Sequence, residues 1–201
     1  MPRILTPEKC VSEKGRWHAS WWIQRFEDDT AYQAFKTAVR KRAREIRMLL
    51  NDPLRTELEN EIALRGKFAY SVTEFAGNAL ENAGINLLWQ LVGGTGGTKF
   101  NEAAAYLAVG DGTDEFDAAD TDLQGSNKTR AAMEAGFPSY GTAQKITYKS
   151  SFGGAVANHA WQEHAVTNAA SGPTILNRKL SDQGTKTAGQ TWVESLEVSL
   201  S

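Results

Sequence analysis

The chain has 201 residues, of which 41% are hydrophobic, and its 22 lysines and arginines nearly balance 24 aspartates and glutamates. This length allows one domain with a substantial buried core, so stability does not require disulfides, and the single cysteine, Cys10, has no intramolecular partner. The formal net charge of −2 argues against a protein that coats nucleic acid through bulk charge.

The sequence contains no stretch that reaches the roughly 20 apolar residues of a membrane-spanning helix. Residues 1–17 carry scattered charges and lack the apolar run of a signal peptide. We therefore expect a protein that is made and assembled in the cytoplasm and does not contact a membrane.

Residues 1–27 are expected to form a Trp-rich arm ahead of the folded regions. Trp17, Trp21 and Trp22 are three of the six tryptophans of the chain, and the first two are four residues apart, as on one face of a helix. Because tryptophan is enriched at the buried centres of interfaces, we take all three as interface candidates. Packing against the protein's own domain is the alternative.

Residues 28–92 are predicted to be a helical region. Apolar residues recur at helical spacing from residue 28 until "NDP" (51–53) stops the pattern, and a second helix follows over 54–66. A third candidate covers 71–92, where Ser71 and Glu74 have the spacing of a capping box.

Charge is segregated along the chain. The segment 36–47, "KTAVRKRAREIR", has six cations against one carboxylate, whereas 111–122, "DGTDEFDAADTD", has six carboxylates and no cation. The basic segment can be a solvated helix face, a phosphate-binding face or a face for an acidic protein surface. Its interface candidates are Arg40, Lys41, Arg42, Arg44 and Arg47.

The acidic segment 111–122 does not have the alternating carboxylates or the central glycine of an EF-hand. We expect a solvated acidic loop, with an irregular or intersubunit cation site as the alternative.

A Gly-rich segment, 93–102, separates the two halves of the chain. Its "GGTGGTKF" differs from a phosphate-binding loop because Thr98 precedes Lys99 and Phe100 follows it. We therefore predict a flexible hinge.

Residues 103–201 are predicted to form an antiparallel β domain. Short runs with period-two alternation are separated by Gly, Asn, Ser and Pro clusters, at 104–110, 144–152, 157–166, 173–180 and 190–200. The fold class is therefore α+β, with an N-terminal helical region followed by an antiparallel β-sandwich-like domain. The core candidates are Tyr106, Leu107, Phe152, Trp161, Leu176, Trp192, Leu196 and Val198.

The segment "NHAWQEHAV" (158–166) brings two histidines and a glutamate close together, as in some zinc enzymes. Its H-x-x-x-E-H order is one residue longer than the metalloprotease motifs. On a strand, His159, Trp161 and Glu163 would share one side and His164 would lie on the other, so the two rings would not share an ion. We expect no metal, no cofactor and no enzymatic activity, with Trp161 in the core and Glu163 in need of a polar partner if it is buried.

The C-terminal half contains a series of short sequence motifs in a particular order. They are "VGDG" (109–112), "TDLQGSNKTR" (121–130), "AMEAGFP" (132–138), "ANHAWQE" (157–163), "NAASGPTILNRK" (168–179), "GTKTAGQTW" (184–192) and "VSLS" (198–201). This order resembles a group of virion structural proteins of tailed bacteriophages, particularly those that infect actinobacteria. His159 and His164 stand where this family tends to have aromatic residues.

The resemblance implies a β-sandwich-like domain on the outside of a phage particle and no catalysis. The expected protein is a capsid decoration (cement) protein that binds the major capsid protein and copies of itself, commonly as a homotrimer, and stabilises the shell. Two alternatives stay open: a tail, collar or fibre-base subunit, and a DNA-binding accessory factor that uses residues 36–47.

Overall fold

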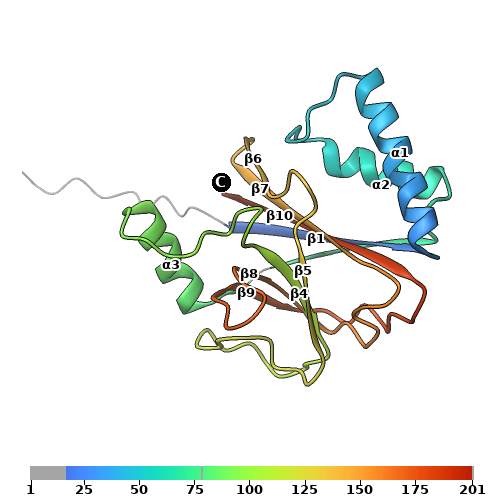
Figure 1. The fold of residues 1–201 in the computed structure, drawn as a ribbon. Helices are drawn as coiled ribbons and strands as arrows, with labels where there is room; N and C mark the ends of the chain where they lie inside the picture. Colours follow the sequence, from blue (N-terminus) through green and yellow to red (C-terminus); the bar gives the residue numbers. More distant parts are fainter. Residues whose placement is uncertain (1–16, 78, 201) are drawn as a thin grey trace, which may run out of the picture.

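The computed structural model describes residues 17–77 and 79–200 (Figure 1). In this part of the chain, ten strands form two five-stranded antiparallel sheets, and three helices accompany them. The fold is α+β and sandwich-like, which confirms the predicted class. Cys10 and the start of the predicted arm lie outside the described residues.

The first sheet, sheet A, has the strand order β2-β1-β10-β7-β6. These strands are β2 (Ser71–Ala76), β1 (Trp17–Phe26), β10 (Thr191–Leu200), β7 (Lys145–Phe152) and β6 (Ser139–Thr142). β1 pairs with β10 along its whole length, so the start of the described chain lies beside its end.

The second sheet, sheet B, has the order β3-β9-β8-β4-β5. Its strands are β3 (Ala79–Leu80), β9 (Ile175–Leu180), β8 (Glu163–Thr167), β4 (Tyr106–Gly110) and β5 (Lys128–Ala132). All described neighbours in both sheets are antiparallel.

The main core lies between the inner faces of the two sheets. Trp161 is at its centre and packs edge-on against Phe152 and Trp192, with ring centroids 4.8 Å and 4.9 Å away. The predicted core residues Leu107, Phe152, Trp161, Leu176, Trp192, Leu196 and Val198 are buried, and Tyr106 is half-buried at the start of β4.

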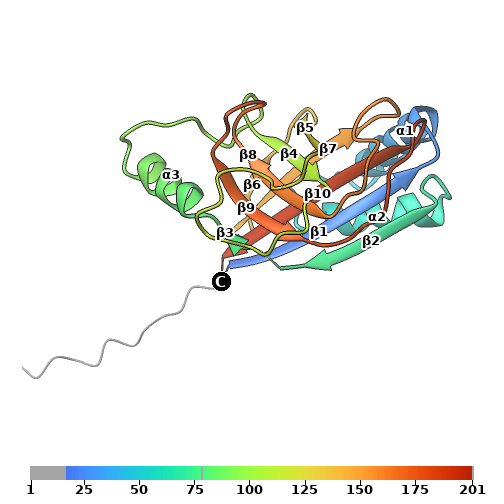
Figure 2. The ribbon, with the colours of Figure 1, turned by 90° about the horizontal axis from the view of Figure 1, so that it is seen from below.

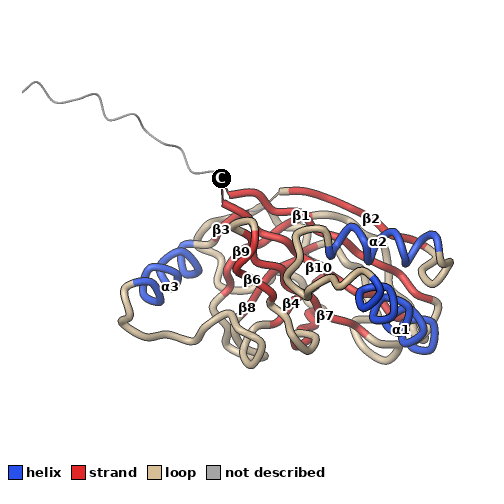
Figure 3. The backbone as a smooth tube through the Cα atoms, turned by 90° about the horizontal axis from the view of Figure 1, so that it is seen from above, coloured by secondary structure: helices blue, strands red, loops and turns tan. Residues whose placement is uncertain are grey.

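Two helices, α1 (Asp29–Glu45) and α2 (Arg55–Arg65), cover the outer face of sheet A (Figures 1 and 3). α1 begins where the Asp28 side chain accepts a hydrogen bond from the Ala31 amide at 2.7 Å, an N-cap that satisfies one free N–H of the first turn. A second apolar cluster joins the helices to the sheet through Phe26, Tyr32, Phe35, Val39, Ala63, Ala69 and Val193.

The long β4–β5 connection covers the outer face of sheet B, seen at the bottom of Figure 1. Leu123 from this connection packs with Ala108, Ala165 and Ile175 in a third small apolar cluster. Each sheet therefore has a covering layer on the side away from the core, made of helices on sheet A and of the acidic segment on sheet B.

The remaining helix, α3 (Asn82–Val92), lies at the side of the sandwich, next to β9 (Figures 1 and 2). No described helix is long and apolar enough to cross a membrane.

The prediction of a Trp-rich arm over 1–27 is wrong for residues 17–26, which form the strand β1 next to the centre of sheet A. Trp21 is fully buried in the main core, so it is not an interface residue. The strand was missed because the opposite face also carries large apolar residues, the half-buried Trp22 and the buried Phe26, so apolar and polar residues do not alternate along it.

The helical prediction for 71–92 is wrong over its first half. Ser71–Ala76 is β2, whose β-branched and aromatic residues suit a strand, and the helix begins only at Asn82. Gly77 follows β2 with φ of 107°, a left-handed conformation that glycine adopts without strain.

Two further predictions, the strand over 157–166 and the hinge over 93–102, differ from the structure. The predicted strand 157–166 begins only at Glu163, as β8. The connection 93–102 contains Phe100, which is buried in the main core, and Thr98, whose carbonyl accepts a hydrogen bond from Nδ2 of the Asn168 side chain at 2.9 Å. These contacts tie the predicted hinge to the sandwich.

Candidate interaction surfaces

A buried carboxylate organises the acidic β4–β5 connection. Glu163, fully buried at the start of β8, accepts hydrogen bonds from the backbone amides of Gly112 at 3.3 Å, Gln124 at 2.9 Å and Gly125 at 2.8 Å. The chain approaches so closely that a Cβ on Gly112 would lie 2.6 Å from the Glu163 Oε1 atom. The two ends of the acidic segment are therefore held together by one side chain of the sheet.

Arg178 on β9 completes this anchor. Its Nε donates to Glu163 Oε2 at 2.8 Å, and its other nitrogens donate to the carbonyls of Asp114 and Glu115 and to the Asp120 carboxylate. Both members of the Glu163–Arg178 pair are inaccessible to solvent. A buried pair needs further hydrogen bonds to offset its desolvation, and here the backbone of the acidic segment supplies them.

The anchor leaves three carboxylates of the segment exposed. Asp114, Glu115 and Asp117 have no ion-pair partner among the described residues, whereas Asp120 pairs with Arg178 and Asp122 pairs with Arg130 and Lys128. We call Asp114, Glu115 and Asp117 the acidic surface. It lies on the outer side of sheet B.

The opposite side of the molecule carries a basic surface, defined as Arg40, Lys41, Arg44 and Arg47. All four are exposed, and within the described part of the chain none is paired with a carboxylate. Arg42, a fifth predicted residue, is also exposed but pairs with Glu45 at 3.2 Å. Val39 and Ala43 face the sheet, whereas Lys41 and Arg44 lie on the exposed part of α1. Arg40 stands at the rim of the cavity between helices and sheet, and Arg47 follows the end of the helix.

The basic helix layer is attached to sheet A by charge as well as by apolar contact. Lys149 on β7 is 2.5 Å from the Glu59 carboxylate of α2, which also pairs with Arg55 at 2.6 Å. Burial by itself raises the pKa of Glu59, but Lys149 and Arg55 together bring it below its usual value. Glu59 is therefore ionised and ties α2 to the sheet.

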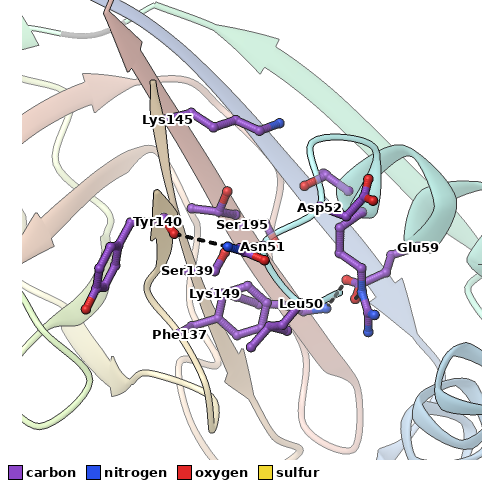
Figure 4. Close-up of a pocket in the computed structure, with 13 residues that line it drawn as sticks. Leu50, Asn51, Asp52, Glu59, Phe137, Ser139, Tyr140, Lys145, Lys149 and Ser195 are labelled. Carbon is purple, nitrogen blue, oxygen red and sulfur yellow. Dashed lines mark hydrogen bonds and ion pairs between the residues drawn. The ribbon is translucent and has the colours of Figure 1, made fainter. Parts of the chain in front are cut away.

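These residues line a closed pocket between α2, the α1–α2 connection and strands β6, β7 and β10 (Figure 4). Asn51 donates to the Tyr140 carbonyl at 3.4 Å across its mouth, and the cavity of about 10 Å³ has room for about one water molecule. A wider cavity of about 250 Å³ adjoins it, and there Lys36 faces Glu134. We interpret these two cavities as small packing gaps where the helices lie against sheet A, and not as a ligand site.

α3 presents an apolar surface to solvent. Trp89 and Val92 are 69% and 78% exposed, although the helix itself is held firmly at its start. The Glu81 amide donates to the Leu176 carbonyl at 3.1 Å, and the Asn82 amide donates to the Ala118 carbonyl at 2.9 Å. An exposed tryptophan on an anchored helix is typical of a contact residue for another molecule.

The histidine segment does not form a metal site. His164 is fully buried, with Nδ1 2.6 Å from Glu194 Oε1 and Nε2 3.0 Å from the Ser181 carbonyl. Because a carbonyl only accepts, Nε2 donates to Ser181, and Nδ1 is the ring nitrogen that faces Glu194. Burial raises the pKa of Glu194, which favours the protonated carboxyl, a donor to Nδ1.

His164 thus links β8 of one sheet to β10 of the other across the core. His159 lies apart from it, within hydrogen-bond distance of the Thr129 hydroxyl at 3.2 Å. The described residues contain no group of three or more His, Cys, Asp or Glu side chains arranged to hold a metal ion.

The structure separates the predicted interface residues into distinct places. Trp17 is exposed at the start of β1, Trp22 is half-buried on the outer face of sheet A, and neither lies on α1 with the basic residues. Trp89 was not predicted. Its only sequence signal is that Trp89 is the one aromatic residue among the apolar residues of 85–92, and periodicity cannot tell an exposed tryptophan from a buried one.

Comparisons with protein-family models, with curated proteins and with solved structures give no match to this chain.

Proposed function

We propose that this chain is a structural protein of a tailed-phage particle, a decoration protein that binds the outside of the capsid shell and stabilises it. The observation that supports the proposal most is the exposed Trp89–Val92 surface on an anchored helix. The resemblance to phage virion proteins gives further support to the proposal. The sequence motifs that carry this resemblance include residues of the strands β4, β5, β8, β9 and β10 of the sandwich.

The proposed partner of the α3 surface is the major capsid protein. Leaving Trp89 in water is unfavourable, and its burial in a pocket of a partner is worth about 2 kcal/mol or more when such a residue lies at the centre of an interface. The sandwich supplies a rigid body behind the helix, so little ordering is needed when the two proteins meet.

A decoration protein works through many identical contacts. Each subunit that binds only the assembled shell stabilises it by mass action, and symmetric repetition multiplies a modest individual affinity. The proposal includes association with further copies of the chain, as a homotrimer, and assigns it no catalytic step, cofactor or metal.

The test uses phage shells stripped of decoration protein. We expect the purified protein to bind them and to raise their resistance to heat and osmotic shock. Trp89→Ala should weaken binding about 30-fold, which corresponds to about 2 kcal/mol. Leu64→Ala, which removes another exposed apolar side chain from α2, is the matched control and should stay within about threefold of the unchanged protein. Failure of the unchanged protein to bind such shells would contradict the proposal.

A further inference from the structure

The acidic and basic surfaces of one molecule have opposite charge and similar size. The basic surface has four exposed cations and the acidic surface three exposed carboxylates, and no described side chain of the same molecule pairs with any of them. Unpaired charges gathered in this way create a field that attracts the opposite charge of a partner.

The two surfaces cannot meet within one molecule. α1 packs on the outer face of sheet A through Phe26 and Val193, and the acidic connection packs on the outer face of sheet B through Leu123. Both sheets and the core therefore lie between them (Figure 1). Contact between these two surfaces requires a second copy of the chain.

Both surfaces are held rigidly. The Glu163–Arg178 anchor fixes the backbone that carries Asp114, Glu115 and Asp117, while the Lys149–Glu59 pair and the apolar cluster around Phe35 fix the helix layer. Because the backbone behind each surface is already ordered, association requires ordering only of the charged side chains, and opposite charge steers two copies into this contact.

We propose that copies of this protein associate head to tail, with the basic surface of one molecule on the acidic surface of the next. Such a contact is heterologous: it leaves one unused surface of each kind and continues into a ring or an open chain. This inference goes beyond the proposed function, because it does not depend on what Trp89 binds.

Two variants with different surfaces reversed give a direct test. The first carries Arg40→Glu and Arg44→Glu, and the second carries Asp114→Lys and Glu115→Lys. Sedimentation equilibrium at low salt should show concentration-dependent association of the unchanged protein, and each variant alone should have a dissociation constant at least about tenfold higher. Raising the salt to about 0.5 M should likewise increase the dissociation constant of the unchanged protein, because salt screens the charges.

The equimolar mixture of the two variants is the decisive sample. The first variant keeps its acidic surface and the second keeps its basic surface, so the mixture should re-form complexes that neither variant forms alone. Lys67→Glu and Glu74→Lys change exposed charges outside both surfaces and should leave the dissociation constant within about threefold. Unchanged thermal unfolding of all variants shows that they are folded.

Three results would overturn the inference: a protein that stays monomeric over the concentration series, association that neither double variant weakens, or a mixture that stays monomeric. A protein that does not self-associate, yet binds duplex DNA through Arg40 and Arg44 with a steep salt dependence, would assign the basic surface to nucleic acid instead.

Discussion

At the scale of single residues, Glu163 has the most extensive role in the described fold. The sequence indicated that it would need a polar partner if buried, but it could not indicate Arg178 or the amides of the acidic segment. These partners come from three separate stretches of chain and have no common spacing. The contacts that hold the acidic surface are therefore visible only in three dimensions.

Replacing Glu163 by Gln should lower the free energy of unfolding by about 3 kcal/mol, because the buried Arg178 loses its fully buried carboxylate partner and keeps only Asp120, at 3.2 Å, as a carboxylate contact. Denaturant unfolding measures the change. Glu61→Gln, which removes an exposed carboxylate paired with Arg65, should cost less than about 1 kcal/mol. A Glu163→Gln protein as stable as the Glu61→Gln protein would contradict the anchor.

At the scale of elements, α3 is the helix on which the proposed function depends. Gly84 lies so close to β9 that a Cβ there would be 2.7 Å from the Leu176 backbone, and only glycine allows this approach. The helix is thus positioned by backbone contact at its start, and its second half carries Trp89 and Val92 outward.

Gly84→Ala should therefore destabilise the protein by about 1–3 kcal/mol and increase amide exchange in 82–92. In a helix without such a contact, a Gly→Ala change would stabilise the protein by up to about 1 kcal/mol. The sign of the change in the free energy of unfolding therefore shows whether Gly84 packs against β9. Asn86→Ala, at an exposed position of the same helix, is the control and should be neutral or stabilising. A more stable Gly84→Ala protein would show that α3 does not pack on β9.

Several elements could be predicted from the sequence, and the others could not for physical reasons. The alternation of 144–152 and 190–200 predicted β7 and β10 closely, and the helical spacing after Asp28 predicted α1. β1 was missed because apolar residues stand on both of its faces, with Trp21 and Ile23 on one and Trp22 and Phe26 on the other, so apolar and polar residues do not alternate. β2 was predicted as helix because its Ser71–Glu74 spacing imitates a capping box.

At the scale of the whole molecule, the described part has four layers: helices, sheet A, sheet B and the acidic connection (Figure 1). The sequence predicted the segregation of charge but not its direction across the sandwich. That direction depends on the pairing of distant strands, such as β1 with β10, which local patterns do not determine. The same arrangement leaves α3 at the side: its start is bonded to Ala118, next to the acidic surface, and its second half carries Trp89 outward.

The location of the protein in an intact particle tests the central claim most directly. Antibody labelling followed by electron microscopy, or a density map of the particle, should place this chain in repeated copies on the outside of the capsid shell, with the Trp89 surface of α3 against the major capsid protein. A chain found only in the tail, collar or fibre base, or absent from particles, would contradict the account.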